Sequence, residues 1–398
     1  MNALSPQIAE YIARGSWIRK IFESGIEMKK IYGDDQVCDF SLGNPDLPPP
    51  NVVGECLAGL AETAQEPFAF GYMPNAGYPH VRTALAAHLS VEQEVAASAG
   101  DVMLTCGAAG GINVFLKAVI EPGEEVLCPA PYFVEYGFYA ENHQAKLVPV
   151  KTTPMTFELD LAAIDAAITP KTRVVLINSP NNPTGQIYPR SQLEGLCDIL
   201  AAHNRKRDRF IYLLADEPYR FLVYHGHKTP AVLPMYPWSC VISSFSKNLS
   251  LPGARIGYVL LAPDMPEKDE LMNGLVFANR ILGFVNAPAI AQNILLRALG
   301  HQVDTAIYAK RRAIMAEVLT QAGYEFSMPK GAFYFFPKAP GGDDVAFVAR
   351  LRDQRILAVP GSGFGYPGYF RLAFCVGEEV IERSLSGFKS AVNVKRVD

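Results

Sequence analysis

The sequence predicts an α/β fold, with a mostly parallel sheet in a large domain and a smaller α+β domain toward the C-terminus. Three observations support this class. Short apolar runs alternate with helical patterns through the middle of the chain, polar residues follow several of these runs, and the pattern changes in the last third. The length of 398 residues suggests two or three domains, because one hydrophobic core rarely serves so long a chain.

The predicted strands are short apolar runs rich in β-branched residues. In chain order they are "EVLCPAP", "RVVLINSP", "FIYLLADE", "CVISSFS" and "RIGYVLL". Helical stretches separate several of them. In "DLAAIDAAITP" Asp160 is the expected N-cap and Pro170 the stop, and "RSQLEGLCDILAAH" repeats Leu193, Leu196 and Leu200. This alternation predicts parallel strands joined by helical crossovers.

The last third of the chain has a different pattern. A helix around Ile307, Ile314 and Val318 is followed by the strand-like runs "GAFYFFP", "RILAVPG" and "YFRLAFCV". This predicts a small α+β domain. The expected units are an N-terminal segment of residues 1–45 that packs on the small domain, a large α/β domain of residues 46–285, and a small domain of residues 286–398.

Composition and charge argue against several classes of protein. The net charge is −4, which gives no electrostatic footprint for nucleic acid or an anionic membrane. The seven cysteines are scattered without a CxxC pair, and "HGH" is isolated, so we expect a reducing compartment and no metal site. The N-terminal stretch lacks the apolar core of a signal peptide, and no apolar run could span a bilayer. We therefore expect a cytoplasmic protein.

Polar side chains follow three of the predicted strands at the point where each strand ends. "RVVLIN" runs into "SPNNPTG", "FIYLLA" into "DEPY", and "CVIS" into "SFSK". Ligands of open α/β sheets bind outside the carboxyl ends of the strands. We therefore expect a common location for Asn182, Asp216, Tyr219, Ser244 and Lys247.

The lysine in this group indicates carbonyl chemistry. A desolvated lysine has a lowered pKa and becomes nucleophilic toward carbonyls. A lysine Schiff base together with an aspartate at a ring nitrogen is the protein signature of pyridoxal phosphate. Ser244 and Arg255 flank Lys247 and suit a phosphate group. The small residues of "TCGAAGG" (105–111) open a predicted helix, whose backbone N–H groups suit the same phosphate.

The chain resembles the fold-type I, class I and II pyridoxal-phosphate aminotransferases over nearly its whole length. The matching segments are "SLGNPD", "GYMPNAGYPHVR", "TCGAAGG", "PAPYF", "SPNNPTG", "DEPY", "SFSK" with "GARIG" after it, "GAFY" and "YFRLAF". The combination of "SFSK", "NNPTG" and "DEPY" is highly specific. The resemblance implies the fold of that class, with pyridoxal 5′-phosphate as cofactor.

The resemblance implies a role for each polar residue beside the cofactor. Lys247 would carry the cofactor as a Schiff base and later move a proton. Asp216 would pair with the ring nitrogen and keep it protonated. Asn182 and Tyr219 would bond the phenolic oxygen. Lys247, Asp216 and Tyr219 are therefore the expected catalytic residues.

The resemblance also implies the ring stack and the phosphate cup. Phe133 would stack on the cofactor ring, with Tyr132 as the alternative. Tyr72 would reach the phosphate from the neighbouring subunit, which implies a homodimer with shared active sites. In that dimer the segment of residues 1–45 would also pack on the partner, and the domain of residues 46–285 would bind the cofactor. The family often has a side-chain donor where this chain has two alanines, so here only backbone N–H groups are offered. The expected phosphate cup is Ala108, Ala109, Ser244 and Arg255.

Arg371 stands in "YFRLAFC", where a strand pattern puts Tyr369 and Ala373 on its face. An arginine among aromatic residues is costly unless it meets an anion. From the pattern alone, that anion is either an internal carboxylate or a bound one. The resemblance implies the second, in which Arg371 holds the substrate α-carboxylate with help from Asn182 and the backbone of Gly43.

The implied reaction is a ping-pong transamination between an L-amino acid and a 2-oxo acid. Arg280 in "FANRILGFVNAP" has two interpretations. It is either an arginine of a helix surface or interface, or it binds the distal carboxylate of a substrate from the other subunit, as in dicarboxylate-specific relatives. The second interpretation favours aspartate or glutamate. We expect glutamate and 2-oxoglutarate as one substrate pair.

Three alternatives compete with this interpretation. A fold-type I carbon–sulfur β-lyase shares nearly all the motifs and would release ammonia and pyruvate from a cysteine conjugate. "SFSK" also matches the S-x-x-K of serine acyl enzymes, but the S-D-N and K-T-G motifs of that class are missing. A non-catalytic regulator would carry a DNA-binding region, for which residues 1–40 are too short.

Overall fold

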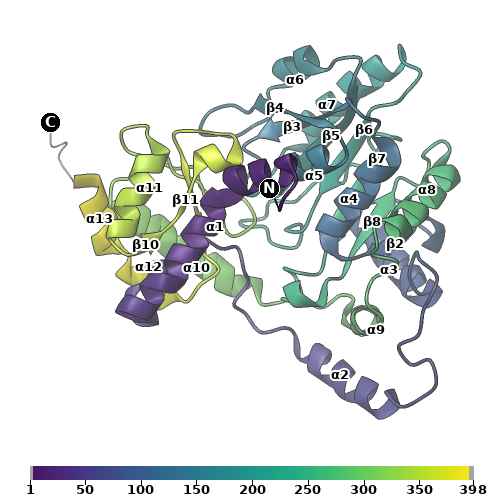
Figure 1. Cartoon of the computed structure of the whole chain (residues 1–398), viewed down its shortest axis with the longest axis horizontal. Helices are drawn as coiled ribbons and strands as arrows, with labels where there is room; N and C mark the ends of the chain where they lie inside the picture. Colours follow the sequence, from purple (N-terminus) through teal and green to yellow (C-terminus); the bar gives the residue numbers. More distant parts are fainter. Residues whose placement is uncertain (1–2, 394–398) are drawn as a thin grey trace.

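The structure, a computed structural model, describes residues 3–393. Residues 1–2 and 394–398 of the expected terminal segments lie outside the described residues. Figure 1 shows a large body built on a sheet and a smaller body to its left, with the long helix α1 (Pro6–Tyr32) starting at the large body and running across the small one. The fold class is therefore the expected α/β fold with two bodies.

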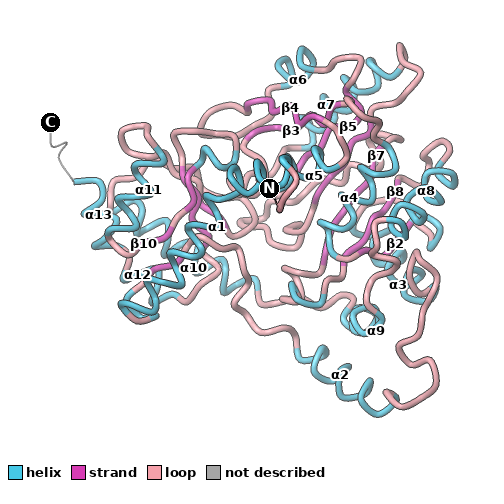
Figure 2. Tube along the Cα trace, viewed as in Figure 1, coloured by secondary structure: helices cyan, strands magenta, loops and turns pink. Residues whose placement is uncertain are grey.

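The large body is built on a seven-stranded sheet in the order β2-β8-β7-β6-β5-β3-β4 (Figure 2). Within the described part of the chain, β8 alone runs antiparallel to its neighbours in this sheet, so the prediction of a mostly parallel sheet is confirmed. The central strands are buried along their length, which explains their continuous apolar runs. The strands are β2 (Val102–Thr105), β3 (Glu125–Ala130), β4 (Lys146–Lys151), β5 (Thr172–Asn178), β6 (Tyr212–Asp216), β7 (Ser239–Ser244) and β8 (Gly257–Leu261).

Helices connect and cover these strands. Asp160 is the N-cap of α6, because its carboxylate accepts a hydrogen bond from the Ala163 backbone N–H, and α6 ends before Pro170 as predicted. Helix α2 packs on α9 and stands apart from the sheet at the bottom of Figure 1. The helices are α2 (Asn51–Thr63), α3 (Pro79–Glu92), α4 (Gly107–Val119), α5 (Glu135–Asn142), α6 (Leu161–Ala167), α7 (Arg190–Asn204), α8 (Lys268–Ile281) and α9 (Ala289–Ala298).

In the part of the chain that the structure describes, the small body combines two short sheets with four helices. An antiparallel sheet has the order β11-β12-β9, and β1 pairs in parallel with β10, so the chain near Cys38 joins this body. The strands are β1 (Cys38–Asp39), β9 (Tyr334–Phe335), β10 (Ile356–Leu357), β11 (Val359–Pro360) and β12 (Phe370–Ala373). The helices are α10 (Thr305–Gln321), α11 (Asp344–Asp353), α12 (Glu378–Arg383) and α13 (Leu385–Asn393).

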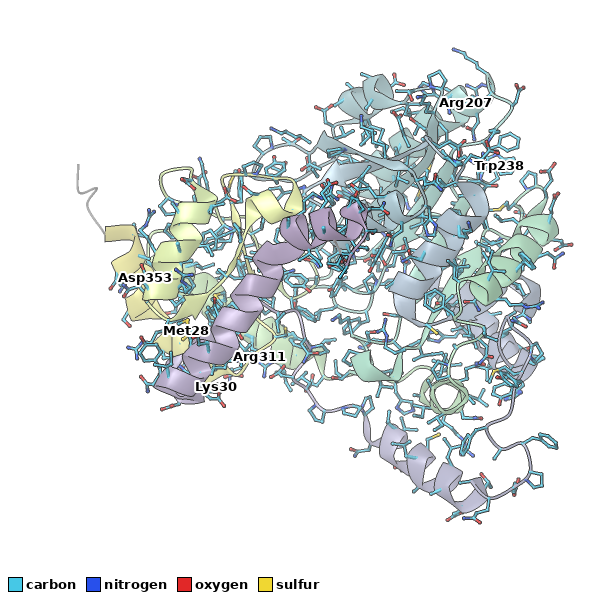
Figure 3. All side chains as sticks on the ribbon, viewed as in Figure 1. Met28, Lys30, Arg207, Trp238, Arg311 and Asp353 are labelled. Atoms are coloured by element: carbon cyan, nitrogen blue, oxygen red, sulfur yellow. The ribbon has the colours of Figure 1, made fainter. Side chains whose placement is uncertain are left out.

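Helix α10 forms where the sequence predicts a helix, around Ile307, Ile314 and Val318. Val318 is buried, while Ile307 and Ile314 are only partly buried and lie next to the fully buried Tyr308 and Met315. The buried face also contains Arg311, which the apolar pattern does not reveal. Figure 3 shows Arg311 in the small body. Its guanidinium forms a two-pronged ion pair with Asp46, at 2.7 and 2.8 Å.

Two large hydrophobic clusters correspond to the two bodies. The larger surrounds the sheet and includes α9 up to Ala298. The smaller contains Phe40 and resumes at Val303. The expected boundaries at residues 45 and 285 stay predictions, and the change of core along the chain falls between Ala298 and Val303.

Candidate active site

A cavity of about 400 Å³ lies at the carboxyl ends of the central strands and reaches the small body. The strand register places two residues of the cavity floor side by side, since Asn178 at the end of β5 pairs with Asp216 at the end of β6. Eleven residues predicted from the sequence line this cavity. They are Gly43, Ala108, Ala109, Phe133, Asn182, Asp216, Tyr219, Ser244, Lys247, Arg255 and Arg371.

Lys247 follows β7 and extends toward the N-terminal loop. Its Nζ donates a hydrogen bond to the Gly43 backbone oxygen at 2.6 Å. Burial lowers the pKa of Lys247 to about 8; the positive charges of Arg371 and Arg255 act in the same direction, and the Cys375 thiol opposes them. A substantial fraction of the amine is therefore neutral just above neutral pH, as a nucleophile or a base requires.

Asp216 ends β6 and is buried at the floor of the cavity. Burial raises its pKa to about 7, Glu217 adds to this rise, and a hydrogen bond from the Tyr136 hydroxyl to Oδ2 opposes it. Its other oxygen, Oδ1, has no hydrogen-bond partner among the described residues. A buried carboxylate oxygen of this kind suits a cationic donor entering the cavity.

The wall nearest Ser244 is formed by closely packed backbone. Gly107 begins α4 with a φ of +74°, and a Cβ added to Gly257 would lie 2.6 Å from the Gly107 carbonyl carbon. Glycine at both positions therefore lets the start of α4 approach the end of β7. The N-terminal turn of α4 brings Ala108 and Ala109 to the cavity, where free N–H groups suit an anion. Arg255 borders the same wall.

Arg371 on β12 is buried, yet no carboxylate pairs with it among the described residues. Its guanidinium donates to Asn182 Oδ1 at 3.2 Å and to the Ser41 backbone oxygen, and its Nε has no partner there. The rings of Tyr334 and Phe364 lie 5.0 and 4.9 Å from the guanidinium carbon. The sequence left open whether Arg371 pairs with an internal carboxylate or with a bound anion. No internal carboxylate pairs with it among the described residues, so a bound anion fits this place.

Tyr219 and Tyr334 both line the cavity, and their hydroxyl groups share a hydrogen bond with 2.7 Å between the two oxygens. Burial raises the pKa of Tyr219 well above its ordinary value, and Tyr334 adds to the rise, so Tyr219 stays protonated near neutral pH. A Cβ at Gly43 would lie 2.0 Å from the Tyr334 oxygen. Only glycine therefore lets the N-terminal loop pass this close to the tyrosine pair.

Two predicted residues lie outside the cavity of their own chain. Tyr72 is 97% exposed, on the segment between α2 and α3. Arg280 is exposed near the end of α8. Neither lines the cavity within one chain, so each can act only at the site of another subunit.

Sequence reasoning missed three residues that help to build the site. Tyr136 holds Asp216, Tyr334 holds Tyr219, and Asn178 donates to the Asp216 backbone oxygen at 2.8 Å. The segment "GAFY" pointed to the region of Tyr334 without giving it a role. Tyr136 lies just after "PAPYF" and carries no motif of its own.

A family model identifies the class of protein to which this fold and site belong. The model for aminotransferase class I and II matches residues 35–388. The chain therefore belongs to the class I and II aminotransferase family, and it is an enzyme of the pyridoxal-phosphate aminotransferase class. The expected fold type is confirmed as well.

Individual relatives and solved structures are similar to this chain over most of its length. The aspartate/prephenate aminotransferase of Thermus thermophilus is 31% identical over 364 residues, which cover 87% of this chain and 89% of the relative. A probable N-acetyl-LL-diaminopimelate aminotransferase of Bacillus subtilis is 28% identical and covers 91% of each chain. A crystal structure of an amino transferase from Eubacterium rectale superposes with a TM-score of 0.93, at 35% identity and 98% coverage of each chain. The structure of aspartate aminotransferase from Thermus thermophilus with maleate gives 0.85 at 26% identity, covering 98% of this chain and 100% of that one.

The described residues contain neither a membrane-spanning helix nor a cluster of metal ligands. None of the helices in residues 3–393 is long and apolar enough to cross a membrane. Among the side chains that the structure describes, no group of three or more histidine, cysteine or acidic residues could hold a metal ion.

Proposed function

We propose that the chain carries pyridoxal 5′-phosphate on Lys247 and moves an amino group between an L-amino acid and a 2-oxo acid in two successive half-reactions. One observation carries the proposal. A lysine with a pKa of about 8 shares a cavity with the buried Asp216, whose Oδ1 has no partner among the described residues. A carbon–sulfur β-lyase of the same fold type is the alternative, and the measurement that closes the Discussion separates the two.

The side chains in the cavity fit this cofactor. Asp216 Oδ1 suits a protonated ring nitrogen, and Phe133 offers an aromatic face. Asn182 and Tyr219 supply polar groups for the phenolic oxygen. A phosphate group fits the N-terminal turn of α4 and its neighbours. The residues that would hold it are Ala108, Ala109, Ser244 and Arg255.

Each polar side chain of the cavity has its own role in the proposed reaction. When bound, pyridoxal phosphate supplies an electron-withdrawing ring that stabilises negative charge at the substrate α-carbon. Arg371 holds the substrate α-carboxylate, and Asn182 fixes the guanidinium that does so. Lys247 Nζ, when neutral, accepts the proton of the α-carbon. Tyr334 orients the Tyr219 hydroxyl through their shared hydrogen bond.

The pH dependence of stability tests the state of Asp216 without using activity. Its folded pKa, about 7, lies above its ordinary value of 3.8. Between these values the unfolded chain ionises while the folded chain stays protonated, so this group makes the folded protein less stable as the pH rises from 4 to 7. We expect cofactor-free Asp216→Asn to match the wild type near pH 4 and to unfold at a higher temperature above pH 7.

Thermal unfolding of the two proteins across this range measures the effect. The Asp198→Asn variant is the control, since Asp198 lies on an exposed face of α7. A constant difference between Asp216→Asn and the wild type from pH 4 to 8 would contradict the raised pKa.

We propose glutamate with 2-oxoglutarate as one substrate pair, and aspartate as a substrate if Arg280 acts from a neighbouring subunit. The names of several relatives support this choice, because they are aspartate aminotransferases. The exposed position of Arg280 on α8 is compatible with it. A guanidinium suits a distal carboxylate through paired N–H bonds.

Replacing Arg280 with alanine tests this role. We expect the KM for aspartate to rise about tenfold, because a charge-assisted hydrogen bond is lost, and the KM for alanine to stay unchanged. Steady-state kinetics with both amino acids measure the difference. Arg205→Ala is the matched control, since Arg205 is exposed at the end of α7. Unchanged aspartate kinetics in Arg280→Ala would remove the hypothesis.

We also propose a cytoplasmic homodimer with shared active sites. Phe68 and Tyr72 are 92% and 97% exposed, and Phe277 on α8 is exposed as well, which is typical of a protein contact surface. The Tyr72 segment is held against α8, where Asn279 donates to the Asn75 backbone oxygen at 3.3 Å. The seven free cysteines suit a reducing compartment. A monomer in sedimentation equilibrium would contradict the dimer.

A further inference from the structure

The active-site cavity adjoins a second cleft. This outer cleft has a volume of about 580 Å³ and lies between α5, the 3-10 helix η4 (Gly361–Phe364) and the first half of α1. Val134 and Glu135 line both the cavity and the outer cleft. We call this border the substrate's route, because the side chain of a substrate held at Lys247 and Arg371 would pass it to extend into the outer cleft.

Glu135 carries a carboxylate with no ion pair or hydrogen bond to any other described side chain. Burial raises its pKa above the ordinary value. Its charge reaches the cavity wall, because the pKa of Tyr139 is raised by burial first and by Glu135 second, and Tyr139 lines the cavity. Glu135 therefore places negative charge on the substrate's route.

The arginine that lines the outer cleft is already paired with carboxylates. Arg14 lines the outer cleft, but its guanidinium pairs with Glu141 at 2.6 Å and with Glu10 at 3.5 Å. On the inner side, Tyr136 holds one oxygen of Asp216, and the other oxygen is assigned to the ring nitrogen of the proposed cofactor. Glu135 is therefore the carboxylate that remains for a ligand in this part of the described structure.

We propose that Glu135 recognises the side chain of the amino acid substrate and selects, in the half-reaction that does not use glutamate, amino acids that end in an amine. The inference rests on the proposed transamination and names its substrate class. Arg371 and Lys247 take the two groups on the α-carbon, so the side chain is the part left to meet Glu135. A partly desolvated carboxylate attracts an ammonium group more strongly than a fully solvated carboxylate does.

Two pairs of amino acids of equal carbon chain test the proposal on the cofactor-bound enzyme. Ornithine is compared with norvaline, and lysine with norleucine, each added alone without an oxo acid. The rate of the spectral change of the cofactor gives kcat/KM for the half-reaction. We expect the wild type to prefer the amine-bearing member of each pair, and Glu135→Gln to lower this preference about tenfold by removing the charge.

Glu141→Gln is the matched control, because Glu141 borders the same outer cleft but is paired with Arg14. Its preference should equal that of the wild type. An unchanged preference in Glu135→Gln, or a wild type that does not prefer the amine-bearing amino acid, would overturn the proposal. If the glutamate half-reaction is normal in that case, the proposed function still stands. Failure of every amino acid, glutamate included, would instead overturn the proposed function and the inference with it.

Discussion

The Lys247→Ala variant is expected to lose turnover by about 10⁴-fold or more. The lysine is the only predicted catalytic group whose amine can both bind a carbonyl and accept a proton from carbon, and a positioned base alone contributes about 10²–10⁴-fold. The environment of Lys247 supports this estimate, because burial and the nearby Arg371 and Arg255 bring its pKa to about 8. The steady-state rate with glutamate and a 2-oxo acid measures the loss.

Two control variants keep this result specific. Lys338→Ala removes a lysine that is half exposed and paired with Glu325 at 3.2 Å, so we expect the wild-type rate. Lys247→Arg keeps the positive charge but cannot become neutral near pH 8, so we expect it to be as inactive as Lys247→Ala. Substantial turnover in either Lys247 variant would mean that this side chain is not the reacting amine.

Replacing Arg371 with leucine is expected to lower kcat/KM for amino acids by about 30–5,000-fold. Truncating one partner of a buried, hydrogen-bonded charge pair costs about 2–5 kcal/mol, and the substrate α-carboxylate is the proposed partner here. The guanidinium is buried beside Tyr334 and Phe364 without a carboxylate among the described residues. Half-reaction rates with several amino acids measure the loss.

An amine without a carboxylate separates binding from folding in this variant. For such an amine, Arg371→Leu and the wild type should react at similarly low rates, since neither can use the guanidinium. Bound cofactor, measured by absorbance, should stay equal to that of the wild type. An Arg371→Leu enzyme that handles amino acids as the wild type does would show that the buried cation serves the fold alone.

The strand ends explain why much of the site could be predicted from the sequence. Asn182, Asp216 and Lys247 each follow a buried strand of a parallel sheet, and such strands end at one edge. Local pattern is enough to place residues of this kind. The N-cap at Asp160 could be predicted for a similar reason, because it depends only on the next turn of helix.

Residues that depend on tertiary contacts could not be predicted in this way. Tyr136 and Tyr334 matter because their hydroxyls meet Asp216 and Tyr219, which lie 80 and 115 positions away in the chain. The buried face of α10 also contains Arg311, which the apolar pattern does not reveal, because its partner Asp46 lies 265 positions away. Pairing over such distances leaves no local pattern.

The pyridoxal-phosphate half-reaction tests the central claim most directly. The purified enzyme is mixed with glutamate alone, and the cofactor absorbance and the 2-oxoglutarate released are followed together. We predict one equivalent of 2-oxoglutarate per active site, a matching change of the cofactor band, and then no further product until a second 2-oxo acid is added. Continuous release of ammonia and pyruvate from a cysteine conjugate, with a cofactor band that persists with every amino acid, would contradict transamination and favour the carbon–sulfur lyase.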